Sequence, residues 1–253
     1  MRLDVFLVSS GLASSRERAQ ELIGNGSVSV NGRICKKNST AVTEEDAILI
    51  SSSLKYVGRG GHKLEKALDC FQLDLANKTV LDIGASTGGF TDCALQRGAS
   101  EVYAVDVGHG QLAESLQKDS RVHNLEGVHV RDLAQYYNGS PDFICIDVSF
   151  LSLTKVFPCI FPYAASADVV ALVKPQFEVR HRKSVIRDPK VHRTVLSLVL
   201  DSARLCGFSV KGLTFSPVRG TEGNIEYLLH LRCDGHDSAV EPVAVVRAAH
   251  ESL

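Results

Sequence analysis

The 253-residue sequence lacks a hydrophobic run that approaches the roughly 18–20 apolar residues of a membrane span. Its first eight residues contain an acid and no small-residue cleavage site after a long apolar core, so they do not predict a secretion signal. The seven cysteines include no C-x-x-C pair. An odd, unpatterned count is typical of free thiols in a reducing compartment, and we therefore expect a cytoplasmic protein.

The sequence also lacks a complete metal-ligand pattern and an internal repeat. Cys233 and His236 have a ligand-like spacing, but no second pair accompanies them, so we predict no metal site. A hydrophobic content of 44% and a charged content of 23% are ordinary for a soluble globular protein. The length allows one large domain and one small one.

A net charge of −1 conceals two basic segments. Residues 1–63 carry nine Lys and Arg against six Asp and Glu, and residues 174–193 carry seven against two. The rest of the chain is therefore acidic on balance. Local basic segments on a nearly neutral protein indicate a polyanion that is contacted at defined places.

The first fifty residues predict a small α+β domain. Apolar spacing predicts a helix over 2–10, and a serine at 14 or 15 caps a second helix that ends near Gly24. Residues 27–30 and 47–50 predict strands, and Asn31-Gly32 is a hairpin-turn signal. The candidate RNA-binding residues are Arg2, Arg16, Arg18, Arg33, Lys36, Lys37 and Arg59. The alternative is a solvated basic face on an accessory domain.

The domain boundaries follow from a change in composition. Residues 51–53 are three serines, and a glycine-rich segment from Gly58 to Gly61 leads into a helical pattern. We therefore predict an RNA-binding domain over 1–54, a linker over 55–62 and a larger domain over 63–253.

The larger domain alternates strands and helices, which predicts an α/β fold of the Rossmann-like, doubly wound type. Strands are expected near 79–83, 101–106, 142–147, 168–173, 208–214 and 225–231. Helices are expected over 89–97, 110–118 and 190–206, with an irregular or helical piece after 151. In such a sheet, ligands bind at the carboxyl ends of the strands.

A glycine turn follows the first of these strands. After Asp82, the residues Gly84, Gly88 and Gly89 have the spacing G-x-x-x-G-G, whereas a dinucleotide fingerprint has G-x-G-x-x-G. This favours S-adenosylmethionine over NAD, although glycines after a first strand can also be purely structural. Asp106, at the end of the next strand, can bind two ribose hydroxyls. The candidate cofactor-binding residues are Asp82, Gly84, Ala85, Ser86, Thr87, Gly88, Gly89, Phe90, Asp106, Val107 and Asp132.

Five runs in the chain, 55–64, 82–92, 146–150, 173–178 and 223–227, carry a resemblance to a known family. The chain resembles the hemolysin-A-like (TlyA-type) family, which joins an S4-type RNA-binding domain to an FtsJ-like 2′-O-methyltransferase domain. The resemblance extends to about residue 232. It implies a Lys–Asp–Lys–Glu catalytic tetrad at Lys63, Asp147, Lys174 and Glu226.

Physical chemistry supports these four positions. Asp147 and Lys174 each end a strongly apolar run, where a charged residue is not expected without a reason. A ribose hydroxyl is a weak acid, and a lysine can act as its base when burial and neighbouring cations lower the amine pKa to about 7–8. The alternatives are a loop-capping role for Asp147 and plain surface charges at Lys63 and Glu226.

Two other patterns bear on the class of methyltransferase. Pro158-Cys159 resembles the nucleophile of carbon-5 cytosine methyltransferases, but it follows its strand by a dozen residues, which favours a core thiol. No Asn-Pro-Pro-aromatic run follows the fourth strand, which argues against methylation of a base amine. The loop over 179–188 departs from the family pattern, because it is shorter and lacks glycine. This departure affects the expected closure of the substrate loop, and with it the identity of the target nucleotide.

Together these features predict a cytoplasmic, S-adenosylmethionine-dependent 2′-O-methyltransferase that acts on ribosomal RNA or a ribosomal subunit. A cytidine target is implied by the resemblance alone. The alternatives are a membrane-acting hemolysin, which the absence of a span or of a strongly amphipathic basic helix disfavours, and a non-catalytic ribosome-assembly factor.

Overall fold

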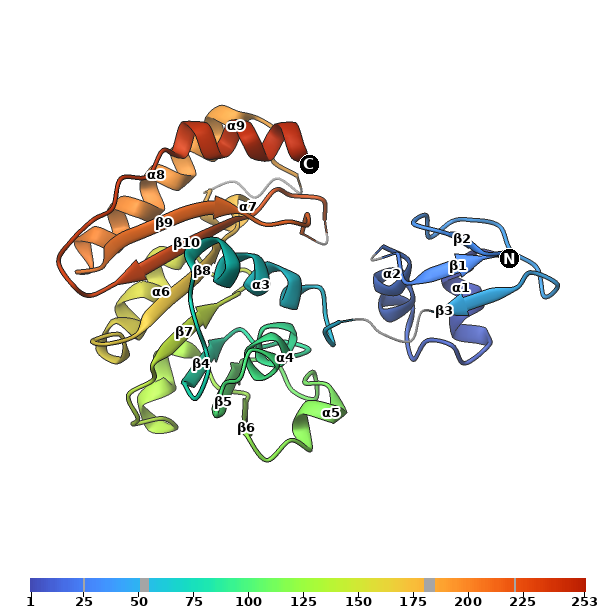
Figure 1. Cartoon of the computed structure of the whole chain (residues 1–253), viewed down its shortest axis with the longest axis horizontal. Helices are drawn as coiled ribbons and strands as arrows, with labels where there is room; N and C mark the ends of the chain where they lie inside the picture. The colour runs from blue at the N-terminus through green and yellow to red at the C-terminus, as the bar shows by residue number, and fades with distance from the viewer. Residues whose placement is uncertain (25, 51–54, 180–184, 221) are drawn as a thin grey trace. The chain divides into compact units, whose positions relative to one another are not determined.

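The computed structural model describes residues 1–24, 26–50, 55–179, 185–220 and 222–253. The chain divides into two compact units, Met1–Arg59 and Gly60–Leu253 (Figure 1). The predicted fold class, an α/β domain with a small N-terminal α+β domain, is confirmed. The predicted domain edges near 54 and 62 stay predictions, and the serine run at 51–53 lies outside the described residues.

The N-terminal unit packs two helices on a three-stranded antiparallel sheet of order β2-β1-β3. Its elements are α1 (Leu3–Ser9), α2 (Arg16–Gly24), β1 (Val28–Val30), β2 (Arg33–Ile34) and β3 (Ile48–Ile50). Leu3, Leu7 and Ile23 are fully buried in its core. Asn31 and Gly32 both have positive φ, at 51° and 77°, as a two-residue hairpin turn requires.

The larger unit contains a seven-stranded sheet of order β6-β5-β4-β7-β8-β10-β9. The strands are β4 (Thr79–Ile83), β5 (Glu101–Asp106), β6 (Val122–Glu126), β7 (Phe143–Ile146), β8 (Asp168–Val173), β9 (Ser209–Phe215) and β10 (Tyr227–Arg232). Strands β4 to β8 pair in parallel, while β10 runs antiparallel to β8 and β9. The strand order reverses at β4, which lies between β5 and β7, and a ligand crevice is expected there.

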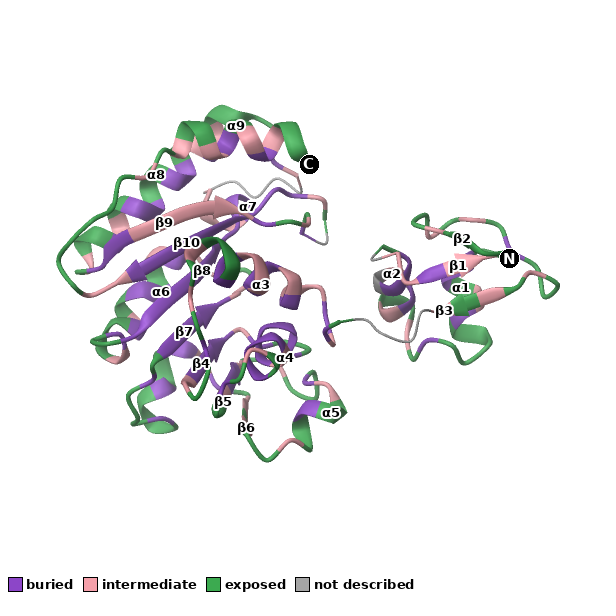
Figure 2. Ribbon diagram, viewed as in Figure 1, coloured by how far each residue is buried: buried purple, intermediate pink, exposed green. Residues whose placement is uncertain are grey.

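Helices cover both faces of this sheet (Figure 1). They are α3 (Gly60–Phe71), α4 (Gly89–Gln96), α5 (Glu114–Gln117), α6 (Leu153–Ile160), α7 (Pro175–Glu178), α8 (Pro189–Leu205) and α9 (Pro242–Ser252), with short 3-10 helices η1 (Val130–Gln135) and η2 (Phe161–Tyr163). Helices α3 and α4 pack on each other, and α6, α8 and α9 share one apolar core with the sheet. Figure 2 shows the central strands almost entirely buried.

The six predicted strands are all present, with ends displaced by no more than two residues. Strand β6 and helix α9 are among the elements that were not predicted. Strand β6 has the polar sequence Val-His-Asn-Leu-Glu and pairs only with β5 at the sheet edge, so it carries little apolar signal. Helix α9 lies in the tail that the sequence left unassigned, and it buries Val246 and Ala249.

The predicted helix over 110–118 is wrong in length, because only Glu114–Gln117 is helical. The carboxylate of Glu126 accepts hydrogen bonds from the backbone N–H groups of Gly110, Gln111 and Leu112 at 2.9, 2.8 and 3.1 Å. These contacts hold the chain in a loop over residues that would otherwise begin the helix. In the ranges that the structure describes, no helix is long and apolar enough to cross a membrane.

Candidate active site

The tertiary structure brings the four predicted catalytic residues to one edge of the large sheet. Asp147 follows β7, Lys174 follows β8, and Lys63 lies in the first turn of α3. Glu226 directly precedes β10, whose first residue Tyr227 pairs with Val173 at the end of β8. Because β10 is antiparallel to β8, its beginning lies beside the carboxyl ends of the parallel strands.

The four side chains form one chain of alternating charge. Lys63 Nζ lies 2.7 Å from Glu226 Oε2 and 3.9 Å from Asp147 Oδ2. Lys174 Nζ lies 2.5 Å from Asp147 Oδ1 and donates to Ser149 Oγ at 3.1 Å. Both lysine side chains are only 10% exposed, and that of Glu226 is 3% exposed. Because water is excluded from these side chains, the attraction between their charges is screened less than in surface ion pairs, while desolvation of the charged groups opposes it.

Electrostatics favour a charged Asp147. Burial alone would raise the pKa of its carboxyl group, but the ammonium groups of Lys63 and Lys174 outweigh burial and hold that pKa below its ordinary value. Two cations and two anions leave the cluster formally neutral, which reduces the cost of burying it.

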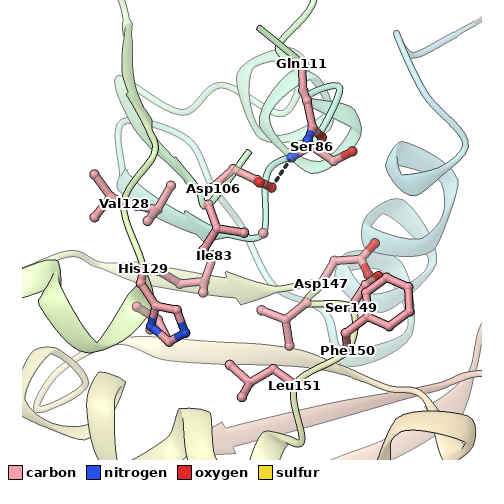
Figure 3. Close-up of a pocket in the computed structure, with 15 residues that line it drawn as sticks. Ile83, Ser86, Asp106, Gln111, Val128, His129, Asp147, Ser149, Phe150 and Leu151 are labelled. Atoms are coloured by element: carbon pink, nitrogen blue, oxygen red, sulfur yellow. Dashed lines mark hydrogen bonds between the residues drawn. The ribbon is translucent and has the colours of Figure 1, made fainter. Parts of the chain in front are cut away.

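A cavity of about 460 Å³ lies next to this cluster, in the size range of small-molecule sites. It opens at the carboxyl ends of β4, β5 and β7. Its lining consists of Ile83, Gly84, Ser86, Val105, Asp106, Val107, Gln111, Val128, His129, Val130, Asp147, Val148, Ser149, Phe150 and Leu151. Figure 3 shows Asp147, Ser149 and Phe150 on one side and Val128 and His129 on the other. Asp147 and Ser149 also contact Lys174, so the cavity and the charged cluster are continuous.

Asp106 anchors the glycine turn over residues 84–89. Its carboxylate accepts hydrogen bonds from the backbone N–H of Ser86 at 2.8 Å and of Gly108 at 2.7 Å (Figure 3). Each carboxylate oxygen keeps acceptor capacity beyond one bond, so the same group can also bind ribose hydroxyls. Ser86 has a φ of +50°, an uncommon conformation that brings its N–H toward Asp106.

The structure separates the predicted cofactor-binding residues into two groups. Gly84, Ser86, Asp106 and Val107 line the cavity. The lining does not include Asp82, Ala85, Thr87, Gly88, Gly89, Phe90 or Asp132.

Asp132 and Asp82 are not part of the cavity lining, and their settings differ. Asp132 is exposed on η1. Asp82 is fully buried and accepts a hydrogen bond from the Thr91 hydroxyl at 2.6 Å. Burial raises its pKa to about 7, although the Thr91 bond opposes the shift.

Two of the glycines serve packing. A Cβ on Gly89 would lie 3.0 Å from the backbone nitrogen of Gly61, so this glycine permits the close approach of α3 and α4. A Cβ on Gly88, which has a φ of +93°, would overlap the side chain of Leu116. The glycine turn therefore shapes both the cavity wall and the helix packing behind it.

Sequence reasoning missed several lining residues. Val128 and His129 follow β6, the strand with little apolar signal. Ser149 and Phe150 lie in the family-like run 146–150, which was the available signal. The Phe150 residue is 70% exposed, has a φ of +63° and packs its ring 5.0 Å from that of Phe177.

The predicted RNA-binding residues fall into distinct settings. Arg33, Lys36 and Lys37 are exposed on the N-terminal unit. Arg2 and Arg16 instead bind the buried carboxylate of Asp4, at 2.9 and 3.1 Å. These two arginines therefore also stabilise their own unit.

Two further candidates and the second basic segment complete the RNA-binding set. Arg18 donates to the backbone oxygen of Val57 at 2.9 Å, and Arg59 is half-buried. Arg180, Arg182 and Lys183, and with them half of the shortened loop, lie outside the described residues.

The remaining sequence candidates lie away from the cavity. Cys159 is on α6 and packs against the apolar core, and its thiol faces the backbone oxygen of Lys155 at 3.4 Å. Among the residues that the structure describes, no group of three or more His, Cys, Asp or Glu side chains could hold a metal ion.

The sequence profile of the FtsJ-like methyltransferase family matches residues 56–233, and that of the S4 domain matches residues 1–48. The chain therefore belongs to the FtsJ-like methyltransferases and carries an N-terminal S4 domain. It is an enzyme of the methyltransferase class, and the predicted family is confirmed.

Three relatives extend over nearly the whole chain. YqxC of Bacillus subtilis, named as a candidate rRNA methyltransferase, is 43% identical over an alignment of 266 positions that covers 100% of this chain and 95% of that protein. The 16S/23S rRNA (cytidine-2′-O)-methyltransferase TlyA of Mycobacterium tuberculosis is 41% identical over an alignment of 260 positions that covers 100% of this chain and 97% of that protein. The structure of a candidate hemolysin from Streptococcus thermophilus has a TM-score of 0.77 at 41% identity and covers 100% and 96% of the two chains.

A substitution at Gly84 tests how tightly the glycine turn packs against the charged cluster. Its φ is +88°, and an added Cβ would lie 2.6 Å from the backbone oxygen of Asp147. We expect Gly84→Ala to destabilise the protein by about 1–3 kcal/mol and to weaken cofactor binding. Gly110→Ala is the matched control, because Gly110 also has positive φ (+65°) but no heavy atom within 4 Å of an added Cβ. Equal losses of melting temperature in the two variants would contradict the packing argument.

Proposed function

We propose that this protein transfers the methyl group of S-adenosylmethionine to the 2′-hydroxyl of a cytidine in ribosomal RNA. The observation that carries the proposal is the buried Glu226–Lys63–Asp147–Lys174 chain, which adjoins a cavity of cofactor size. The name of the Mycobacterium tuberculosis relative supports the nucleotide and the acceptor atom. Because ribosomal RNA is the proposed substrate, we propose a cytoplasmic site of action.

The cavity residues fit the parts of S-adenosylmethionine. Asp106 would bind the ribose hydroxyls, and the apolar side chains of Val107 and Val128 with the ring of His129 would surround the adenine. Asp147 and Ser149 would lie nearest the sulfonium, since they connect the cavity to Lys174. When bound, the cofactor supplies an electrophilic methyl group.

The tetrad would activate the acceptor. Lys174 would first lose a proton to solvent, and a ribose hydroxyl beside it would then give its proton to Nζ. As the hydroxyl oxygen bonds to the methyl carbon, the carbon–sulfur bond would break and the sulfonium would leave as a neutral thioether. Asp147 and Ser149 orient Lys174, and Lys63 joins Asp147 to Glu226. The hydroxyl proton thus ends on Lys174, and solvent removes it before the next turnover.

The S4 domain supplies the second part of the proposal. Its exposed Arg33, Lys36 and Lys37 would contact RNA phosphates, as would the other basic residues predicted above. We propose that residues 1–54 bind ribosomal RNA or a ribosomal subunit, that 55–62 link the domains, and that 63–253 carry out methyl transfer. A non-catalytic assembly factor is less well supported, because all four tetrad side chains are present and connected.

Asp106→Ala tests the cofactor assignment. Loss of a charged acceptor for the ribose hydroxyls should cost about 1.5–3 kcal/mol, or roughly 10–150-fold in affinity for S-adenosylmethionine. Asp142→Ala is the control, because Asp142 also accepts a backbone N–H bond, from Thr79 at 2.9 Å, but does not line the cavity. Calorimetry with S-adenosylmethionine and with NAD provides the measurement. Tight NAD binding without binding of S-adenosylmethionine would refute the assignment.

Lys174 separates chemistry from binding. We expect Lys174→Ala to retain affinity for S-adenosylmethionine and RNA but to lose methyl transfer by about three orders of magnitude, because the proton acceptor is gone. Lys174→Arg should be nearly as inactive, since a guanidinium stays protonated. Single-turnover transfer of a labelled methyl group measures the effect. Near-normal turnover in the arginine variant would show that only the positive charge matters.

The acceptor atom can be tested with one substituted RNA. A ribosomal RNA fragment with a 2′-deoxy sugar at the mapped target should bind with normal affinity and accept no methyl group, because it lacks the acceptor oxygen. The unmodified fragment serves as the control, and mass spectrometry of the digested RNA gives the position of the methyl group. Methylation of the deoxy fragment would show that a base atom is the acceptor.

A further inference from the structure

A buried hydrogen-bond chain lies beside Glu226. His192 of α8 is fully buried, with Nδ1 2.6 Å from the Tyr227 hydroxyl and Nε2 3.0 Å from the backbone oxygen of Ile186. Asn224 Oδ1 accepts a hydrogen bond from the backbone N–H of the same Ile186 at 2.8 Å. Both backbone groups of Ile186 are therefore bound to side chains.

The donors and acceptors in this chain have one consistent direction. A carbonyl oxygen only accepts, so His192 Nε2 must carry the proton that it shares with Ile186. In the neutral ring Nδ1 is then an acceptor, and the Tyr227 hydroxyl donates to it. The chain runs from Tyr227 through His192 and Ile186 to Asn224.

The backbone of Glu226 is part of the ring that this chain closes. Asn224 lies two residues before Glu226 and Tyr227 follows it directly, so the hydrogen bonds join the two sides of the backbone segment that carries Glu226. On another side, a Cβ on Gly220 would overlap Glu226 Oε1, and Oε2 of Glu226 binds Lys63 at 2.7 Å. Fixing Asn224 and Tyr227 therefore fixes the origin of the Glu226 side chain.

We propose that His192 is a positioning residue for the charged cluster: by joining Tyr227 to Ile186 it holds Glu226 on Lys63. This inference rests on the proposed function, in which Glu226 takes part in methyl transfer. The rest of the buried face of α8 is apolar around Val195, Leu196 and Val199, and an apolar side chain at 192 would fill the same core. A satisfied polar network adds directional geometry that an apolar residue does not supply.

The chain should also respond to pH. Burial lowers the pKa of His192, while its bond to Ile186 opposes the shift. The other charged or titratable groups that act on it are His250 of α9, Asp188 at the start of α8, and Arg219 after β9.

Protonation would break the direction of the chain. It would place donors on both ring nitrogens and force the Tyr227 hydroxyl to reverse. Because the folded-state pKa is below the unfolded one, the contribution of neutral His192 to stability is complete above about pH 6.5 and is lost as the pH falls below it.

Tyr227→Phe tests the proposal in the full-length protein. This variant keeps the buried ring and removes only the donor to His192. We expect kcat to fall about tenfold from misplacement of Glu226, with the dissociation constant of S-adenosylmethionine within about twofold of wild type. We also expect the decline of kcat on the acid side, measured from about pH 5 to pH 8, to shift in the variant.

His230→Gln is the matched control. His230 is also a buried histidine in contact with a partner, Asp168 Oδ1 at 2.9 Å, but it lies toward the opposite end of β10. It should lower the melting temperature and leave kcat and its pH profile unchanged. If Tyr227→Phe behaves like His230→Gln, His192 is only a structural residue and the proposal is overturned.

A second variant keeps the test decisive if one protein folds poorly. His192→Asn can keep an acceptor for Tyr227 at the position of Nδ1, but its shorter side chain has no donor at the position of Nε2 for Ile186, so it cuts the same chain at another bond. The double variant with Tyr227→Phe should have the same kcat as the less active of the two single variants, whereas additive losses would overturn the proposal.

Glu226→Gln distinguishes a failure of this proposal from a failure of the proposed function. If it retains full methyl transfer, the proposed tetrad fails; if it is inactive and Tyr227→Phe is not, only the role of His192 fails.

Discussion

The contact on which the rest of the site depends is the one between Asp147 and two lysines. Its carboxylate lies 2.5 Å from Lys174 Nζ and 3.9 Å from Lys63 Nζ. Two buried ammonium groups could not be held near each other without an anion between them, because like charges repel strongly where water is excluded. Asp147 also lines the cavity, so the same residue connects the charged cluster to the proposed cofactor site.

The sheet topology makes this contact possible. Parallel strands β7 and β8 place Asp147 and Lys174 at neighbouring carboxyl ends. Strand β10 runs antiparallel to β8, so its first residues, and Glu226 just before them, lie at the same edge of the sheet. A parallel strand at that position would have its beginning at the opposite edge. The site therefore requires β10 to be antiparallel. The hydrogen bonds of His192 and Asn224 stabilise the backbone at the start of this strand.

Much of the fold was predictable, because burial of parallel strands imposes continuous apolar runs. Strands β4, β5 and β8 were predicted with the bounds that the structure has, whereas β6 was missed because an edge strand buries little. The helix expected over 110–118 is short because Glu126, which is remote in sequence, binds the backbone at 110–112. Local propensity gives no indication of such a contact.

For the site, the sequence by itself determined which residues end the apolar strands and match the motifs: Asp106, Asp147 and Lys174 among them. Only the tertiary structure decided which of the candidates meet. It brought Lys63 within 2.7 Å of Glu226 although 163 residues separate them, and it buried Asp82 outside the cavity lining and left Asp132 exposed. The physical reason is that motif spacing fixes position along a strand, whereas contact depends on strand order and direction, which long-range backbone pairing sets.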